Sequence, residues 1–167
     1  MKLHIGGTVR QEGWTNLDVE ARPEVDIVAN CRSMPMIGSN TADCVYASHV
    51  LEHLNYNTEL PAALAEIFRV LKPGGSLMLS VPDLQTLCWL FNMPHFGARE
   101  RYHIMDTMFG GGEHRGGLTE EYLSPVLAKA GFQDIRRVER FGQFQDFSDF
   151  KIFGLRISLN LVASKPA

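Results

Sequence analysis

The sequence contains few cysteines and no long hydrophobic run. Cys31, Cys44 and Cys88 are odd in number and widely spaced, and no C-x-x-C pair occurs. This pattern argues against a disulfide framework or a cysteine zinc site, so we expect reduced thiols and a cytoplasmic protein. No apolar run approaches the ~20 residues that a membrane-spanning helix needs. No apolar segment follows the basic start either, so we expect neither a membrane protein nor a secretory signal.

An excess of positive charge is also missing. The chain has 16 Lys and Arg against 19 Asp and Glu, which gives a formal net charge of −3. Without a basic stretch there is no electrostatic basis for nucleic-acid binding, and we expect no such partner. The 167 residues, 45% of them hydrophobic, suffice for one globular domain with a sizeable core. The oligomeric state stays open, a homodimer included.

Short apolar segments alternate with helical patterns along the chain. Strands are expected at 3–5, 14–19, 25–29, 42–47, 76–81, 134–141 and 157–163. One helix is predicted to begin after Thr58 and to end at the Lys72-Pro73-Gly74-Gly75 stretch, and a second begins after Thr119 and ends at Gly131. Alternating strands and helices predict an α/β doubly wound sheet, in which ligands bind beyond the carboxyl ends of the strands.

Two neighbouring segments carry a family resemblance. RVLKPGGSLMLSVPD (69–83), preceded by YASHVLEHL (46–54), resembles the class I S-adenosylmethionine-dependent methyltransferases, most closely a small bacterial subgroup. The resemblance implies a Rossmann-like, mostly parallel seven-stranded sheet with an antiparallel last strand. It also implies one domain over residues 1–167, with an insertion at about 84–118. The implied reaction is methyl transfer from S-adenosylmethionine to an unidentified small-molecule or glycan-type acceptor.

The first loop departs from the family's pattern. Gly6 matches the first glycine, Gly7 stands at the intervening position, and Thr8 replaces the second glycine. The stretch from Gly6 to Trp14 is shorter than the ~10–12 residues of an ordinary crossover, so we expect a compacted first βα unit. The resemblance implies that Gly6 and Gly7 lie against the cofactor, and that Asp18 accepts hydrogen bonds from its ribose hydroxyls.

Further cofactor contacts are implied after the third and fourth strands. Asn30 and Cys31 follow the third strand, and Ser48 and His49 follow the fourth. For Asn30 there is an alternative, because an asparagine in a loop often bonds its own backbone.

Three histidines are candidate general bases: His49, His103 and His114. The last two belong to the segment RERYHIMDTMFGGGEH (99–114). The sequence equally allows this segment to be a small packing helix on Tyr102, Met105 and Phe109 with its histidines on the surface. Phenylalanines also recur every third residue from 141 to 153, and we expect at least one of them to face the pocket.

HVLEH (49–53) also fits the H-x-x-E-H pattern of zinc peptidases. Two histidines four residues apart bind a metal from one helix face, but this motif directly follows a strand. We therefore expect no metal site, and a zinc hydrolase is a remote alternative. A nicotinamide enzyme does not fit, because the later glycines of G-x-G-x-x-G are missing. The missing glycine also leaves open a cofactor-binding module or an inactive methyltransferase-like subunit.

Overall fold

The computed structural model describes residues 1–167 and contains a seven-stranded sheet in the order β3-β2-β1-β4-β5-β9-β6. Neighbouring strands pair in parallel except for β9, which is antiparallel to both β5 and β6. The predicted mostly parallel sheet with an antiparallel last strand is confirmed. The strands are β1 (Lys2–Ile5), β2 (Trp14–Asp18), β3 (Ile27–Val28), β4 (Ala42–Ser48), β5 (Leu71–Pro82), β6 (Gln133–Val138) and β9 (Ser158–Ser164).

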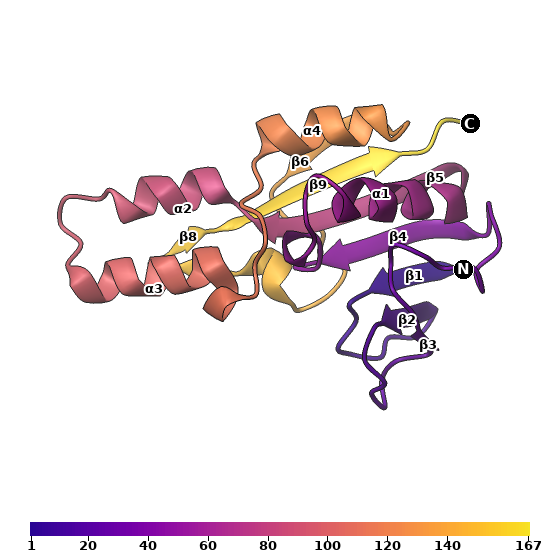
Figure 1. The fold of residues 1–167 in the computed structure, drawn as a ribbon, viewed down its shortest axis with the longest axis horizontal. Helices are drawn as coiled ribbons and strands as arrows, with labels where there is room; N and C mark the ends of the chain where they lie inside the picture. The colour runs from indigo at the N-terminus through magenta and orange to yellow at the C-terminus, as the bar shows by residue number, and fades with distance from the viewer.

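Two helices lie on one side of the sheet (Figure 1). Helix α1 (Glu59–Val70) connects β4 to β5, and α4 (Glu120–Lys129) precedes β6. Both pack into one cluster of 26 buried residues together with alternate residues of the strands. Leu60, Leu64 and Ile67 are fully buried in α1, as their helical spacing predicts. No helix of the chain combines the length and apolar character needed to cross a membrane.

The first βα unit is compacted, as expected. The chain passes from β1 to β2 and from β2 to β3 without a helix. Side chains alternate between the two faces of a strand, so Cys44 and Tyr46 of β4 point away from α1. There they form a smaller cluster with Trp14, against which Phe141 and Phe144 pack. This second face of the sheet is therefore covered by irregular chain.

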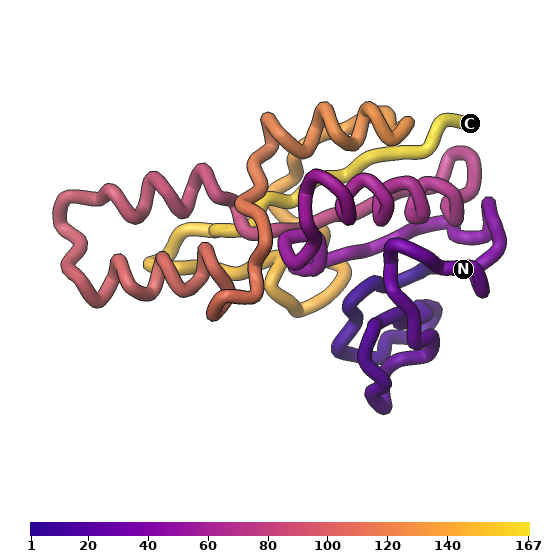
Figure 2. The backbone as a smooth tube through the Cα atoms, in the orientation of Figure 1, coloured from indigo at the N-terminus to yellow at the C-terminus, as the bar shows by residue number.

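The segment after β5 forms a helical hairpin, α2 (Leu84–Phe91) and α3 (Ala98–Phe109), followed by the 3₁₀ turn η2 (Gly110–Gly112). Figures 1 and 2 show it projecting from the end of the sheet opposite the two termini. Leu87, Leu90 and Ile104 pack there beside the small hairpin β7 (Lys151–Ile152) and β8 (Leu155–Arg156). The alternative prediction of a packing helix named the wrong side chains. Ile104 is the buried residue of α3, whereas the three predicted packing residues are exposed: Tyr102, Met105 and Phe109.

The start of β5 and the end of β6 differ from the predicted bounds by three residues or more. Strand β5 begins at Leu71 rather than Ser76, because Leu71 already pairs with Ala42 of β4. The KPGG stretch forms an irregularity in the strand before pairing resumes at Cys44 and Ser76. Gly74 has a φ of 75°, the conformation for which glycine is suited. Strand β6 ends at Val138 rather than at residue 141, because the chain there leaves β9 to cover the second face of the sheet.

Candidate functional site

Two cavities meet beyond the carboxyl ends of the parallel strands. The smaller, about 540 Å³, lies at the ends of β1 to β3 and is called here the strand-end cleft; Gly6, Asp18 and Cys31 line it. The larger, about 870 Å³, is called the histidine cavity, and four of its lining residues are His4, His49, His103 and His114. Both cavities share four lining residues, so a molecule in one adjoins a molecule in the other: Gly6, Thr8, His49 and His53.

Gly6 brings bare backbone to the junction of the two cavities. Its φ is 73°, and its N–H donates to the carbonyl of Leu17 at 2.8 Å. A Cβ at this position would overlap Val50 Cγ2. Close packing against Val50 therefore requires glycine at this position, where the backbone lines both cavities. Gly7 lines neither cavity. A Cβ at position 7 would lie 2.6 Å from Asn16 Oδ1, so close packing against β2 is the reason for a glycine there.

Asp18 ends β2 in the wall of the strand-end cleft. One carboxylate oxygen accepts a hydrogen bond from the Glu20 N–H at 2.9 Å. The other forms an ion pair with Arg22 Nη2 at 2.6 Å, and the Asp18 side chain is 13% exposed. The carboxylate is thus held in place, and a ligand with a vicinal diol would compete with Arg22 for it.

Asn30 and Cys31 also line the strand-end cleft. The Asn30 side-chain oxygen accepts from both the backbone N–H and the Nε of Arg32 at 3.0 Å. The side-chain oxygen thus bonds the local backbone, as the alternative interpretation of Asn30 predicted. The residue nevertheless lines the cleft. Burial raises the pKa of the Cys31 thiol to about 11, so the thiol is neutral at physiological pH.

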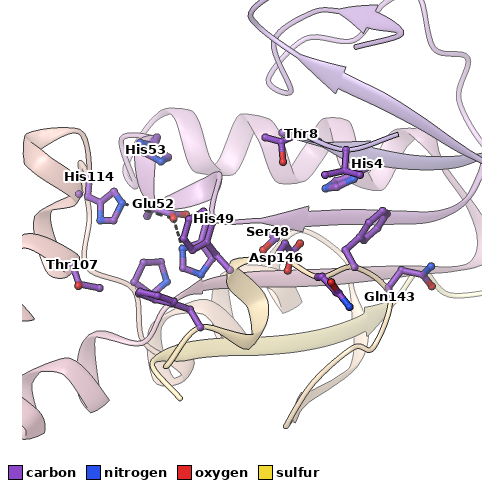
Figure 3. A pocket seen from close by; sticks show the side chains of 18 of the residues that line it. His4, Thr8, Ser48, His49, Glu52, His53, Thr107, His114, Gln143 and Asp146 are labelled. Carbon is purple, nitrogen blue, oxygen red and sulfur yellow. Dashed lines mark ion pairs between the residues drawn. The ribbon is translucent and has the colours of Figure 1, made fainter. Parts of the chain in front are cut away.

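His49 occupies the sharp turn after β4 and reaches both cavities. Its φ of 53° is unusual for a residue with a side chain, and such strain is often found at functional sites. Its Nε2 lies 3.1 Å from Ser158 Oγ. On the other side of the ring, Nδ1 lies 3.4 Å from Glu52 Oε1 (Figure 3). Burial lowers the pKa of His49 to about 4, so the ring is neutral near pH 7.

Glu52 is the most deeply buried acid of the histidine cavity. It is 1% exposed, and neither carboxylate oxygen receives a hydrogen bond. Burial raises its pKa to about 8. Figure 3 shows Glu52 beside His49, His53 and His114 at one end of the cavity.

The HVLEH motif does not form the zinc-peptidase helix. His49 precedes a short 3₁₀ turn, η1 (Leu51–His53), and the ring of His53 lies edge-on to His114 at 5.0 Å between ring centroids. Donor atoms of Glu52, His53 and His114 all lie within 4.8 Å of one another. Gly110 permits this approach, because a Cβ on it would overlap the His114 ring.

All three candidate bases line the histidine cavity. His49 enters from the turn after β4, exposed His103 from α3 and His114 from the chain after η2, but only His49 also reaches the strand-end cleft. Ser48 lines the histidine cavity alone. Phe144, Phe147 and Phe150 form an aromatic wall, which confirms that at least one phenylalanine of the repeat faces the pocket. Polar side chains complete the lining: Thr8, Gln11, Asp106, Thr107, Gln143, Gln145 and Asp146.

Sequence reasoning missed Thr8 and Glu52 as site residues. A weak signal existed for Glu52, since it is the only acid in the apolar stretch VLEHL. A buried acid in such a stretch suggests a special environment. Nothing in the sequence indicated that His53 and His114 meet.

His4 makes the stability of this wall depend on pH. The ring is 5% exposed, packs against Tyr46 and Phe144, and its Nδ1 has no hydrogen-bond partner. Burial lowers its pKa from 6.5 to about 4. The unfolded chain therefore takes up a proton as the pH falls from 6.5 toward 4 while the folded protein does not, and folding stability is lost over that range.

We expect His4→Phe to remove this loss. Between pH 7 and pH 4 the unfolding free energy of the wild type should fall by about 3 kcal/mol more than that of the variant, since one pKa unit corresponds to about 1.4 kcal/mol. Urea unfolding at several pH values measures this difference, because the other titrating groups contribute equally to both proteins. Parallel pH profiles would contradict a neutral, buried His4.

Known proteins resemble the chain in part of its sequence and in its fold. Residues 10–79 match a family model described as a methyltransferase domain. No curated protein is similar enough in sequence to count as a relative. A possible exported protein from Bordetella parapertussis superimposes with a TM-score of 0.62 at 13% identity, over 99% of this chain and 62% of the other. The chain thus spans less than two thirds of that protein.

Two further structures carry methyltransferase descriptions. An S-adenosylmethionine-dependent methyltransferase from Archaeoglobus fulgidus has a TM-score of 0.63 at 14% identity, over 98% of this chain and 85% of the other. The Burkholderia thailandensis 1,6-didemethyltoxoflavin-N1-methyltransferase, solved with 1,6-didemethyltoxoflavin and S-adenosylhomocysteine, has a TM-score of 0.60 at 17% identity, over 99% and 71%. The chain thus has the fold of the class I S-adenosylmethionine-dependent methyltransferases, and residues 10–79 resemble a methyltransferase domain in sequence.

Proposed function

We propose that the protein transfers the methyl group of S-adenosylmethionine to a small, hydroxylated acceptor of the glycan type. One observation carries this proposal: the strand-end cleft and the histidine cavity share Gly6, Thr8, His49 and His53. A cofactor in the first and an acceptor in the second would therefore meet at one place. Holding two reactants in contact is the main requirement of this reaction.

The strand-end cleft has the groups to hold the cofactor. Gly6 offers its backbone beside the methionine part, Asp18 offers carboxylate oxygens to the ribose diol, and Asn30 and Cys31 line the region for adenine. When bound, S-adenosylmethionine supplies an electrophilic methyl group on a positively charged sulfur. The protein then has to align the acceptor with that group and exclude water.

The histidine cavity suits a polar acceptor with one apolar face. Phe144, Phe147 and Phe150 present ring surface, whereas Gln11 and Gln143 offer amide donors and acceptors. A volume of about 870 Å³ is in the range of small-molecule sites. Rings together with side-chain amides match the alternating apolar and hydroxyl surfaces of a sugar unit.

His49 is the proposed general base. It lines both cavities, and its lowered pKa keeps the ring neutral and able to accept a proton. Its Nε2 is engaged by Ser158, so the proton of an acceptor hydroxyl would pass to Nδ1. His103 and His114 line only the acceptor side.

A cofactor-binding module without transfer activity is the second candidate. Two observations favour it: Thr8 replaces the second glycine of the loop, and Asp18 is already paired with Arg22. Incubation with labelled S-adenosylmethionine and pools of hydroxylated small molecules separates the two functions. Label transfer supports the enzyme, whereas saturable cofactor binding without transfer to any pool supports the module.

Asp18→Ala tests the cofactor site itself. We expect S-adenosylhomocysteine to bind about 10- to 150-fold more weakly, the equivalent of about 1.5–3 kcal/mol for a hydrogen bond to a charged group. Titration calorimetry measures the affinity. Glu24→Ala is the matched control, because Glu24 also pairs with Arg22 but does not line the cleft. Equal affinities of the two variants would remove Asp18 from the site.

A further inference from the structure

Glu52, His53 and His114 converge at the end of the histidine cavity. Their donor atoms lie within 4.8 Å of one another, and His114 Nε2 is 3.9 Å from Glu52 Oε1. All three residues line the cavity. Glu52 is 1% exposed and its carboxylate receives no hydrogen bond, although a buried carboxylate normally requires a partner.

The hydrogen bonds of His114 determine which ring nitrogen faces Glu52. Its Nδ1 lies 3.0 Å from the carbonyl oxygen of Met108, which accepts hydrogen bonds only, so we assign the ring proton to Nδ1. In the neutral ring, Nε2 then carries a lone pair directed toward the carboxylate. A backbone carbonyl on one nitrogen and a free lone pair on the other is the usual arrangement of a metal-binding histidine.

His49 presents a second lone pair to the same oxygen. Ser158 has one hydroxyl hydrogen, which it donates to the carbonyl of Phe147 at 2.6 Å, so His49 Nε2 must donate to Ser158 Oγ. His49 Nδ1 is therefore unprotonated, and it lies 3.4 Å from Glu52 Oε1. A single carboxyl proton satisfies at most one of these two nitrogens, whereas a bound cation attracts every lone pair around it.

We infer that Glu52, His53 and His114 form a binding site for a divalent transition-metal ion such as Zn²⁺. Two imidazoles and one carboxylate suit Zn²⁺ and its first-row neighbours, whereas Mg²⁺ and Ca²⁺ prefer oxygen ligands. Three protein ligands leave a coordination position free, and all three of these residues line the histidine cavity.

The role of this ion rests on the proposed methyl transfer. An ion at this position would bind the acceptor oxygen, orient it toward the strand-end cleft and favour loss of its proton to His49 Nδ1. The sequence predicted no metal because the HVLEH motif directly follows a strand rather than lying within an established helix. In the structure His114, from the chain after the helical hairpin, takes the place of His49 beside His53.

Metal titration of the whole chain tests the site without any assay of activity. Protein stripped with a chelator is titrated with Zn²⁺ by calorimetry and with Co²⁺ by visible absorption. We expect one ion per chain. Metal binding should weaken by more than about 100-fold in each of three variants, Glu52→Gln, His53→Ala and His114→Ala. About 100-fold is the upper limit for loss of a residue that only hydrogen-bonds to a metal ligand. Exposed His95 lies outside both cavities, so His95→Ala should bind as the wild type does.

Separate outcomes identify which proposal fails. Absence of Zn²⁺ and Co²⁺ binding, or binding that the variants leave unchanged, overturns the metal site. Circular dichroism shows which variants are folded, and any one of the three that folds suffices for the comparison. A parallel titration with S-adenosylhomocysteine tests the proposed function alone, because the strand-end cleft does not include Glu52 or His114.

Discussion

Gly6→Val is expected to abolish binding of S-adenosylhomocysteine. Gly6 has a φ of 73°, and a Cβ on it would overlap Val50 Cγ2. A branched side chain must therefore push Val50 away or move the loop, and either change fills the junction of the two cavities. Calorimetry should show no heat of binding at concentrations that saturate the wild type.

Gly13→Val separates this effect from backbone strain. Gly13 lies in the same loop with a φ of 79°, but a Cβ on it would meet no atom within 4 Å, and it lines neither cavity. Both variants suffer the left-handed backbone penalty, about 1–2 kcal/mol per residue. Only Gly6→Val should lose the ligand. Wild-type affinity in Gly6→Val would mean that this loop is an ordinary turn and that the cofactor proposal fails.

Asp83→Ala is expected to lower the unfolding free energy by about 3 kcal/mol, from loss of a helix cap and of a charge-assisted hydrogen bond. Asp83 is 1% exposed at the end of β5. It accepts hydrogen bonds from the backbone and hydroxyl of Thr86 in α2, and from Arg137 Nη2 of β6 at 2.7 Å. It therefore fixes the helical hairpin, which carries His103 into the histidine cavity, to the sheet.

Chemical denaturation measures this loss, with Asp43→Ala as the control. Asp43 also pairs with positive charge, from Lys72 and the amino terminus, but its side chain is 56% exposed. Exposed ion pairs contribute at most about 1 kcal/mol. If Asp83→Ala destabilises no more than Asp43→Ala, then Asp83 does not hold the hairpin.

The elements of the fold were largely determined by the sequence. A spacing of three and four residues places Leu60, Leu64 and Ile67 on one helix face, and all three are fully buried. The short stretch from Gly6 to Trp14 excludes a crossover helix, and the structure contains none. These predictions succeed because periodicity and loop length are local properties, and burial of apolar side chains follows from them.

The site was predictable where it follows directly from a strand end. Gly6, Asp18, Asn30, Cys31 and His49 all reach the cavities, because the carboxyl ends of parallel strands meet at one edge of the sheet. Gly7 does not, since the direction of a loop peptide depends on packing against Asn16. The ion pair between Asp18 and Arg22 was not predicted either, because it also depends on the direction that the loop takes.

Only the tertiary structure brought Glu52, His53 and His114 together. His114 is separated from the other two by α1, β5 and the helical hairpin, and its approach depends on the path of that hairpin beyond the end of the sheet. Periodicity reports which side chains are buried, but it does not report the path of an insertion between strands. The tautomers of His49 and His114 depend in turn on contacts with Ser158 of β9 and with the carbonyl of Met108 in α3.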